Sequence, residues 1–146
     1  MNVFSAMEIV ASGLAAERTR LNVTSSNLAN AGTTRTPEGG PYRRRDPVFQ
    51  SQPVTTKFQE LLNDKIARQA HGVETAEIVQ DQMPPRMVHD PGHPDADANG
   101  FVAYPNISSV EEMVNMMMAA RAYEAGTTAM RLITGMASTA LQIGKG

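Results

Sequence analysis

The C-terminal stretch from Ser108 to Ile143 constrains the fold most, because apolar residues recur there at every third or fourth position. This spacing predicts one long helix that packs lengthwise against other helices. Ser108 and Glu111 have capping-box spacing and mark its start. At ~1.5 Å per residue the helix would be about 50 Å long, whereas a compact chain of this size has a diameter of only about 40 Å. We therefore expect an elongated molecule, or a helix that neighbouring chains complete.

The same stretch carries two apolar rows side by side. The first is interrupted only by two threonines and consists of Met113, Met116, Ala120, Tyr123, Thr127, Met130, Thr134, Ala137 and Leu141. The second has no polar member and consists of Ala119, Ala122, Gly126, Ala129, Ile133, Met136, Ala140 and Ile143. Two rows predict that the helix is covered on more than one side, since a single row would be enough for one partner.

A second long amphipathic helix is predicted from Ser5 to Ala31, with Gly32 as a natural stop. Six of eight positions on its row are apolar; the row is Met7, Val10, Leu14, Glu17, Leu21, Thr24, Leu28 and Ala31. The predicted fold class is mainly α: the long N- and C-terminal helices pack as an antiparallel coiled-coil hairpin, with a small β and loop-rich middle region. We expect residues 1–32 and 108–146 to form one coiled-coil domain, with 33–107 as the middle region.

The middle region is expected to hold little regular structure. Prolines and glycines between 33 and 55 exclude long elements there. Three consecutive arginines, Arg43–Arg45, lack the interleaved aromatic residues of a nucleic-acid platform, so a solvated or inter-subunit ion-pair role fits them better. Short strands are predicted at 73–79, 87–89 and 101–104, and 56–70 fits either a short helix or a flexible insertion.

Composition and spacing exclude several kinds of chemistry. The net charge of −2 argues against general nucleic-acid binding, and the absence of cysteine excludes disulfides and thiolate sites. Asp95 to Gly100 matches the first half of a calcium loop, but Asn106 stands where that loop needs a glutamate. No nucleophile is paired with a base. We predict that the protein is not an enzyme, has no metal or other cofactor, and binds neither nucleic acid nor a small-molecule substrate.

Several segments together resemble the bacterial flagellar rod and hook proteins. The N-terminal signature of these proteins is NVTSSNLANAGTT at 22–34. A smaller group within them is indicated by further segments at residues 35–44, 90–97, 104–106, 110–114 and 120–125. These segments are similar to the proximal-rod members of that axial protein family. The resemblance implies a structural subunit of the flagellar basal-body rod. In that family the terminal helices form the inner coiled-coil layer of a helical proximal rod, which transmits torque across the periplasm.

The resemblance also implies partners and a location. The partners are other copies of the chain, other rod proteins, the rod–ring adaptor, the membrane-ring protein and the flagellar type III export apparatus. The location is the periplasmic rod of the flagellar basal body. The first residues lack the basic region of a cleavable signal peptide, and no apolar run reaches membrane-spanning length. We therefore expect export without signal-peptide cleavage.

We expect the assembly interface to combine apolar side chains with asparagines that fix the register between subunits. It consists of Leu14, Leu21, Asn22, Asn27, Asn30, Met117, Ala120, Tyr123, Ala129, Met130, Ile133 and Leu141. The polar end of the first helix could instead be a fraying terminus. Two other classes stay open: a free-standing coiled-coil adaptor or chaperone, which would fold fully alone, and a metal-dependent module centred on 89–99, which calcium or zinc would stabilise.

Overall fold

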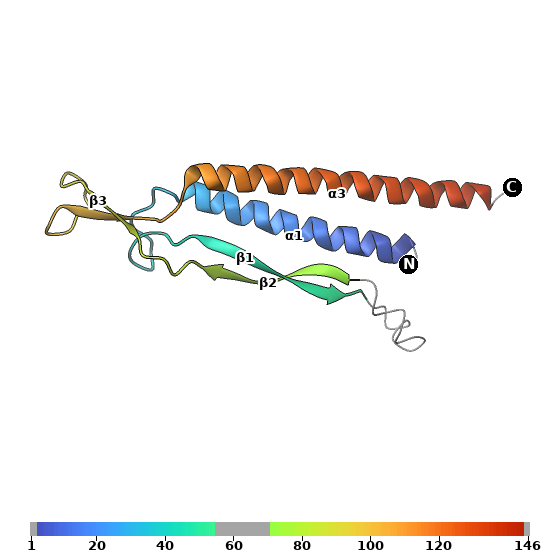
Figure 1. Ribbon diagram of the computed structural model, residues 1–146, viewed down its shortest axis with the longest axis horizontal. Helices are drawn as coiled ribbons and strands as arrows, with labels where there is room; N and C mark the ends of the chain where they lie inside the picture. Colours follow the sequence, from blue (N-terminus) through green and yellow to red (C-terminus); the bar gives the residue numbers. More distant parts are fainter. Residues whose placement is uncertain (1–2, 55–70, 145–146) are drawn as a thin grey trace.

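Two long antiparallel helices form the spine of the protein. A computed structural model describes residues 3–54 and 71–144. Helix α1 spans Val3–Ala29 and helix α3 spans Ser109–Ile143, and the two lie side by side along most of their length (Figure 1). Both chain termini therefore lie at the same end of an elongated molecule (Figure 1), which is the shape expected from the length of the helices.

Four strands form two separate antiparallel ribbons. The first ribbon pairs β1 (Arg45–Pro53) with β2 (His71–Gln80), and the second pairs β3 (Arg86–His89) with β4 (Phe101–Tyr104). The register of the first ribbon shifts after Val48, which pairs with Glu77, so that Phe49 pairs with Thr75. The β1–β2 ribbon packs along α1 on the side away from α3, and the β3–β4 ribbon lies beyond the start of α3 (Figure 1).

The predicted fold class is wrong, because the middle region is not a small appendage to a helical hairpin. The β1–β2 ribbon has strands of nine and ten residues and forms a third layer below the helices. The prolines between 33 and 55 predict that no long strand forms there, and β1 contradicts this prediction. Pro47 and Pro53 lie in a ribbon of only two strands, where a residue without an N–H can turn its unpaired side to the outside. The predicted strands at 73–79, 87–89 and 101–104 are confirmed within β2, β3 and β4. The predicted helix or insertion at 56–70 lies outside the described residues.

The start of α3 follows the sequence signal, whereas the start of α1 does not. Ser108 is the N-cap of α3, and its side chain accepts a hydrogen bond from the Glu111 N–H at 3.4 Å. Helix α1 begins at Val3, so Ser5 is a buried residue of its first turns and not its cap. In the described part of the chain, neither helix is long and apolar enough to cross a membrane.

Among the described residues, helix α3 is covered on one face only, whereas α1 contacts both α3 and the β1–β2 ribbon. The covered face of α3 takes members from both predicted rows: Ala119 is buried, and Tyr123, Gly126, Met130, Ile133 and Ala137 are half-buried. The opposite face stays exposed; we call it the outer face, and its large apolar members are Val110, Val114, Met117, Leu132, Met136 and Ile143. The expected cover of α3 on a second side is therefore not provided by residues 3–54 and 71–144.

Glycine allows two close approaches in the three-layer stack. A Cβ on Gly126 would lie 2.8 Å from Leu14 Cδ2, so α3 rests directly on a leucine of α1. A Cβ on Gly72 would lie 2.7 Å from Ser12 Oγ, and that hydroxyl also accepts the Val73 N–H at 3.0 Å. The small residues at these contacts set how near each neighbouring layer comes to α1.

Gly126→Ala and Gly135→Ala form a matched test of the helix contact. Each change gains up to about 1 kcal/mol of helix propensity. At Gly135 nothing lies within 4 Å of the new methyl, so the gain should appear as increased stability. At Gly126 the methyl displaces Leu14, so we expect that variant to be less stable than Gly135→Ala by more than about 1 kcal/mol. Thermal or urea unfolding of the two purified variants measures the difference, and equal stabilisation would show that the helices are not in this contact.

Candidate assembly surface

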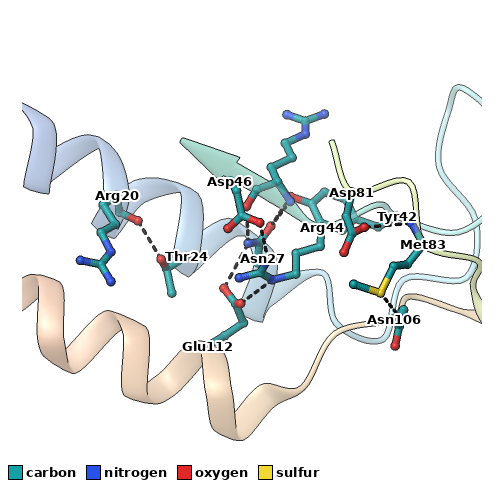
Figure 2. Close-up of polar contacts among 11 residues, drawn as sticks. Arg20, Thr24, Asn27, Tyr42, Arg44, Asp46, Asp81, Met83, Asn106 and Glu112 are labelled. Atoms are coloured by element: carbon teal, nitrogen blue, oxygen red, sulfur yellow. Dashed lines mark hydrogen bonds and ion pairs between the residues drawn. The ribbon is translucent and has the colours of Figure 1, made fainter. Parts of the chain in front are cut away.

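A buried asparagine forms the centre of the contact between the helices and the middle region. Asn27 is 1% exposed, and its side-chain amide makes four hydrogen bonds (Figure 2). Its Nδ2 donates to the Arg45 carbonyl at 2.8 Å and to Glu112 Oε2 at 3.1 Å. Its Oδ1 accepts from the Tyr42 hydroxyl at 3.1 Å and from the Arg45 N–H at 2.9 Å. The hydrogen-bonding capacity of the amide is therefore filled within the chain.

A buried ion pair adjoins this amide. Glu112 is 2% exposed, and its second carboxylate oxygen, Oε1, accepts from Arg44 Nε at 2.8 Å. Arg44 also pairs with Asp46. Burial lowers the pKa of Arg44, but the hydrogen bond with Glu112 and the charge of Asp46 outweigh it, so that its pKa is raised. Arg44 thus stays charged, and the buried carboxylate of Glu112 has a permanent counter-ion.

These contacts, which we call the Asn27 cluster, connect four parts of the chain. The cluster consists of Asn27, Tyr42, Arg44, Arg45 and Glu112, from α1, the loop after it, the start of β1 and the first turn of α3. Glu112 is not among the interface residues predicted from the sequence. Its position seven residues before Ala119 places it on the covered face, and that spacing could have identified it.

The other predicted asparagines have different surroundings. Asn22 is exposed on α1. Asn30 donates from Nδ2 to the Ser26 carbonyl at 2.9 Å, and its Oδ1 accepts from the Thr33 hydroxyl at 3.1 Å, so it supports the turn that ends α1. Of the three asparagines, only Asn22 is exposed and available to a neighbour.

The predicted apolar interface residues fall into two groups. One group is half-buried between the helices or along their edges: Leu14, Leu21, Ala120, Tyr123, Ala129, Met130 and Ile133. Met117 and Leu141 form the other group and are exposed. Met117 is the only large outer-face residue in the prediction, which did not include Leu132 at 64% exposure, Met136 at 71%, Val110, Val114 or Ile143. Met136 belongs to the second predicted row, and Leu132 directly precedes Ile133 of the same row. Sequence spacing does not show which of two apolar faces of a helix will pack against the other helix of the same chain.

The loop between β3 and β4 uses its polar residues for turns. Asp97 Oδ1 accepts the N–H groups of Asn99 and Phe101, both at 2.8 Å, and Asp95 Oδ2 accepts from the Thr34 hydroxyl at 2.8 Å. Across residues 3–54 and 71–144, no group of three histidine or acidic side chains is placed to hold a metal ion. The partial calcium motif is thus a turn in the described structure.

Comparison with known proteins identifies the family. A family model described as "Flagella basal body rod protein" matches residues 7–35, and one described as "Flagellar basal body rod FlgEFG protein C-terminal" matches residues 98–143. A protein of Borreliella burgdorferi named flagellar basal-body rod protein FlgC is 39% identical over 100% of both chains. The proteins of that name in Bacillus subtilis and Salmonella typhimurium are 40% and 38% identical, over 99% of this chain and 100% and 98% of theirs.

This chain belongs to the FlgC family of flagellar basal-body rod proteins. The resemblance drawn from the sequence segments is confirmed, and so is a structural role in the basal-body rod, since the FlgC relatives are rod proteins and not enzymes. The two family matches coincide with α1 and the turn after it, and with β4 and α3. The Asn27 cluster thus joins the two segments that carry the family signature.

Asn27→Asp should destabilise the fold much more than Asn22→Asp. The new carboxylate cannot donate to Glu112 or to the Arg45 carbonyl, and it adds a second buried negative charge. We expect a loss of at least about 3 kcal/mol. The exposed Asn22→Asp control should change stability by less than about 0.5 kcal/mol.

The loss in Asn27→Asp should also depend on pH. Two adjacent carboxylates bind a proton more tightly in the folded than in the unfolded state, so the variant gains stability as pH falls from about 7 to about 5. Urea unfolding across that range measures both effects. Equal stability of the two variants would contradict the central position of Asn27.

Proposed function

We propose that this FlgC-family chain assembles into the flagellar basal-body rod by packing its terminal helices against neighbouring subunits. In this proposal residues 1–32 and 108–146 form the axial domain, and residues 33–107 form the middle region, which lies outside the helices. The rod is proximal and helical, and it transmits torque across the periplasm. The β1–β2 ribbon lies on the side of α1 away from α3, which is compatible with an outer position.

The exposed outer face of α3 carries the proposal. The face runs along the helix from Val110 to Ile143, and its large apolar side chains have no cover among the described residues. Large exposed apolar side chains gathered at both ends of a helix face are typical of a surface that another protein covers. At ~1.5 Å per residue α3 is about 52 Å long and α1 only about 40 Å, so the C-terminal end of α3 extends beyond its partner helix. The overhang gives a neighbour access to more than one side of α3.

The predicted interface residues divide between two functions in this proposal. Met117 and Leu141 contact neighbours directly, and Asn22 contributes to register from the exposed side of α1. Leu14, Leu21, Ala120, Tyr123, Ala129, Met130 and Ile133 hold the two helices together and expose only their edges to a neighbour. Asn27 and Asn30 position the helices through contacts in their own chain.

The proposed partners are components of the same basal body. They are other copies of the chain, other rod proteins, the rod–ring adaptor and the membrane-ring protein. The flagellar type III export apparatus would deliver the subunit. The family relationship supports assembly with basal-body components in general, and the exposed face of α3 supports contacts made through helices.

Met136→Asp tests this function without disturbing the folded chain. Met136 is exposed to 71%, so the isolated variant should unfold within about 0.5 kcal/mol of the unchanged protein. In the rod the carboxylate would be buried against apolar neighbours, which is strongly unfavourable. We expect cells that carry only this variant to lose motility and to lack complete rods in electron micrographs of basal bodies.

Met83→Asp is the matched control. Met83 is exposed to 61% in the loop between the two ribbons, outside both helices, and its sulfur accepts from Asn106 Nδ2 at 3.5 Å. This variant should leave motility intact. If Met136→Asp cells swim normally, the outer face of α3 is not an assembly surface.

A further inference from the structure

A groove runs along α1 between α3 and the β1–β2 ribbon. It has a volume of about 650 Å³ and an apolar lining from all three layers. The larger side chains in it are Val10, Leu14, Phe49 and Val73, and the smaller residues are Gly13, Ala16, Ala122, Ala125, Gly126 and Ala129. Small residues on the floor of a groove permit another helix to approach closely.

One carboxylate oxygen in this groove lacks a hydrogen-bond partner. Glu17 lines the groove, and its Oε2 atom is shielded from solvent and accepts no hydrogen bond. The nearest cation is Arg20, whose Nη1 lies 3.8 Å away, which is beyond hydrogen-bond length. The side chain of Glu17 as a whole is 26% exposed, so other atoms of it can be reached from outside although Oε2 is shielded. A charged oxygen in apolar surroundings is stabilised by a cation with a hydrogen-bond donor.

The outer face of α3 offers the complementary surface. Near its C-terminal end, Leu132, Met136 and Ile143 are strongly exposed and lie close together with Arg131. Arg131 is exposed and has no ion-pair partner anywhere in residues 3–54 and 71–144. We call these four residues the ridge: three large apolar side chains and one cation. The groove has small apolar residues and one carboxylate.

The ridge cannot fill the groove of its own chain, because it lies on the face of α3 that points away from α1. Leu14 meets Gly126, and Asn27 meets Glu112, so Glu17 lies beside the middle of α3, well before the ridge. A ridge that docks in the groove must therefore come from another molecule.

We propose that the ridge of one copy of the chain docks in the groove of a second copy, with the Arg131 guanidinium paired to Glu17 of that copy. The proposal rests on assembly of the chain into the rod and specifies which faces meet. Charge complementarity selects the occupant: the groove has a carboxylate whose Oε2 has only a 3.8 Å ion pair with Arg20, and the ridge has a guanidinium without an ion pair among the described residues. The contact is heterologous, since groove and ridge are different surfaces, and such contacts propagate into an open helical polymer.

A pair of cysteine substitutions tests the contact directly. The chain contains no cysteine, so Glu17→Cys with Arg131→Cys introduces two unique thiols. Under mild oxidation of purified basal bodies, we expect products with the mass of two or more copies of the chain. Glu17→Cys with Arg121→Cys is the matched control, because Arg121 is exposed on the same helix ahead of the ridge; this pair should give no such products.

The outcomes separate the contact from assembly itself. If the doubly substituted chain is present in basal bodies but forms no product, or joins only a different rod protein, the ridge does not dock in the groove of a second copy and this inference is wrong. Assembly into the rod would still stand. If the unchanged chain is absent from basal bodies, both the contact and the proposed function are wrong.

Charge reversal gives a second measurement that does not depend on disulfide geometry. Glu17→Arg or Arg131→Glu alone places like charges together, so we expect each to lower the yield of complete rods at least about tenfold. The double reversal should restore the yield to within about twofold of the unchanged chain. Glu17→Arg with Arg121→Glu should not restore it. Equal yields for single and double reversals would overturn the pairing of Glu17 with Arg131.

Discussion

The hydrogen bond between Asn27 and Glu112 is the interaction on which the rest of the structure depends. Two long helices with apolar residues on several faces could pack at many rotations and axial offsets. The buried pair of Asn27 and Glu112 is compatible with only one combination of rotation and offset, because any other combination would leave a buried carboxylate and a buried amide without hydrogen-bond partners. With Glu112 fixed beside Asn27, Gly126 meets Leu14 and the large residues of the outer face point away from α1. The polar contact inside the chain thus decides which apolar surface is presented outside it.

The same cluster explains why the β1–β2 ribbon accompanies the helices. Arg45 is the first residue of β1, and both its N–H and its carbonyl bond to the Asn27 amide. Farther along, the Ser12 hydroxyl accepts the Val73 N–H, so β2 is fixed to α1 as well. A two-stranded ribbon is marginal on its own. Here it is held at both ends and gives α1 a second covered side, which leaves α3 as the helix with an open face.

Sequence reasoning identified the two helices and three of the strands but not the layered arrangement. The helices were accessible because their apolar spacing extends over many turns and Ser108 caps α3 as predicted. The β1 strand was not predicted because a proline, which has no N–H to donate, interrupts a central strand of a sheet. Pro47 and Pro53 lie in a two-stranded ribbon, where each strand is an edge strand. Asn27 was predicted to hydrogen-bond to a neighbouring subunit. An asparagine near the end of a helix shows only that its amide needs hydrogen-bond partners, and not whether they belong to the same chain. Which partners it finds depends on Tyr42, Arg45 and Glu112, which are distant from it in sequence or in another element.

The central claim is that the outer face of α3 is open in the isolated subunit and covered in the rod. Thiol labelling of a Met136→Cys chain tests it most directly, since the chain has no other cysteine. We predict rapid labelling of the isolated chain and strong protection in purified basal bodies, while a Met83→Cys chain reacts in both and shows that the reagent has access. Equal labelling of Met136→Cys in the isolated chain and in basal bodies would contradict the account.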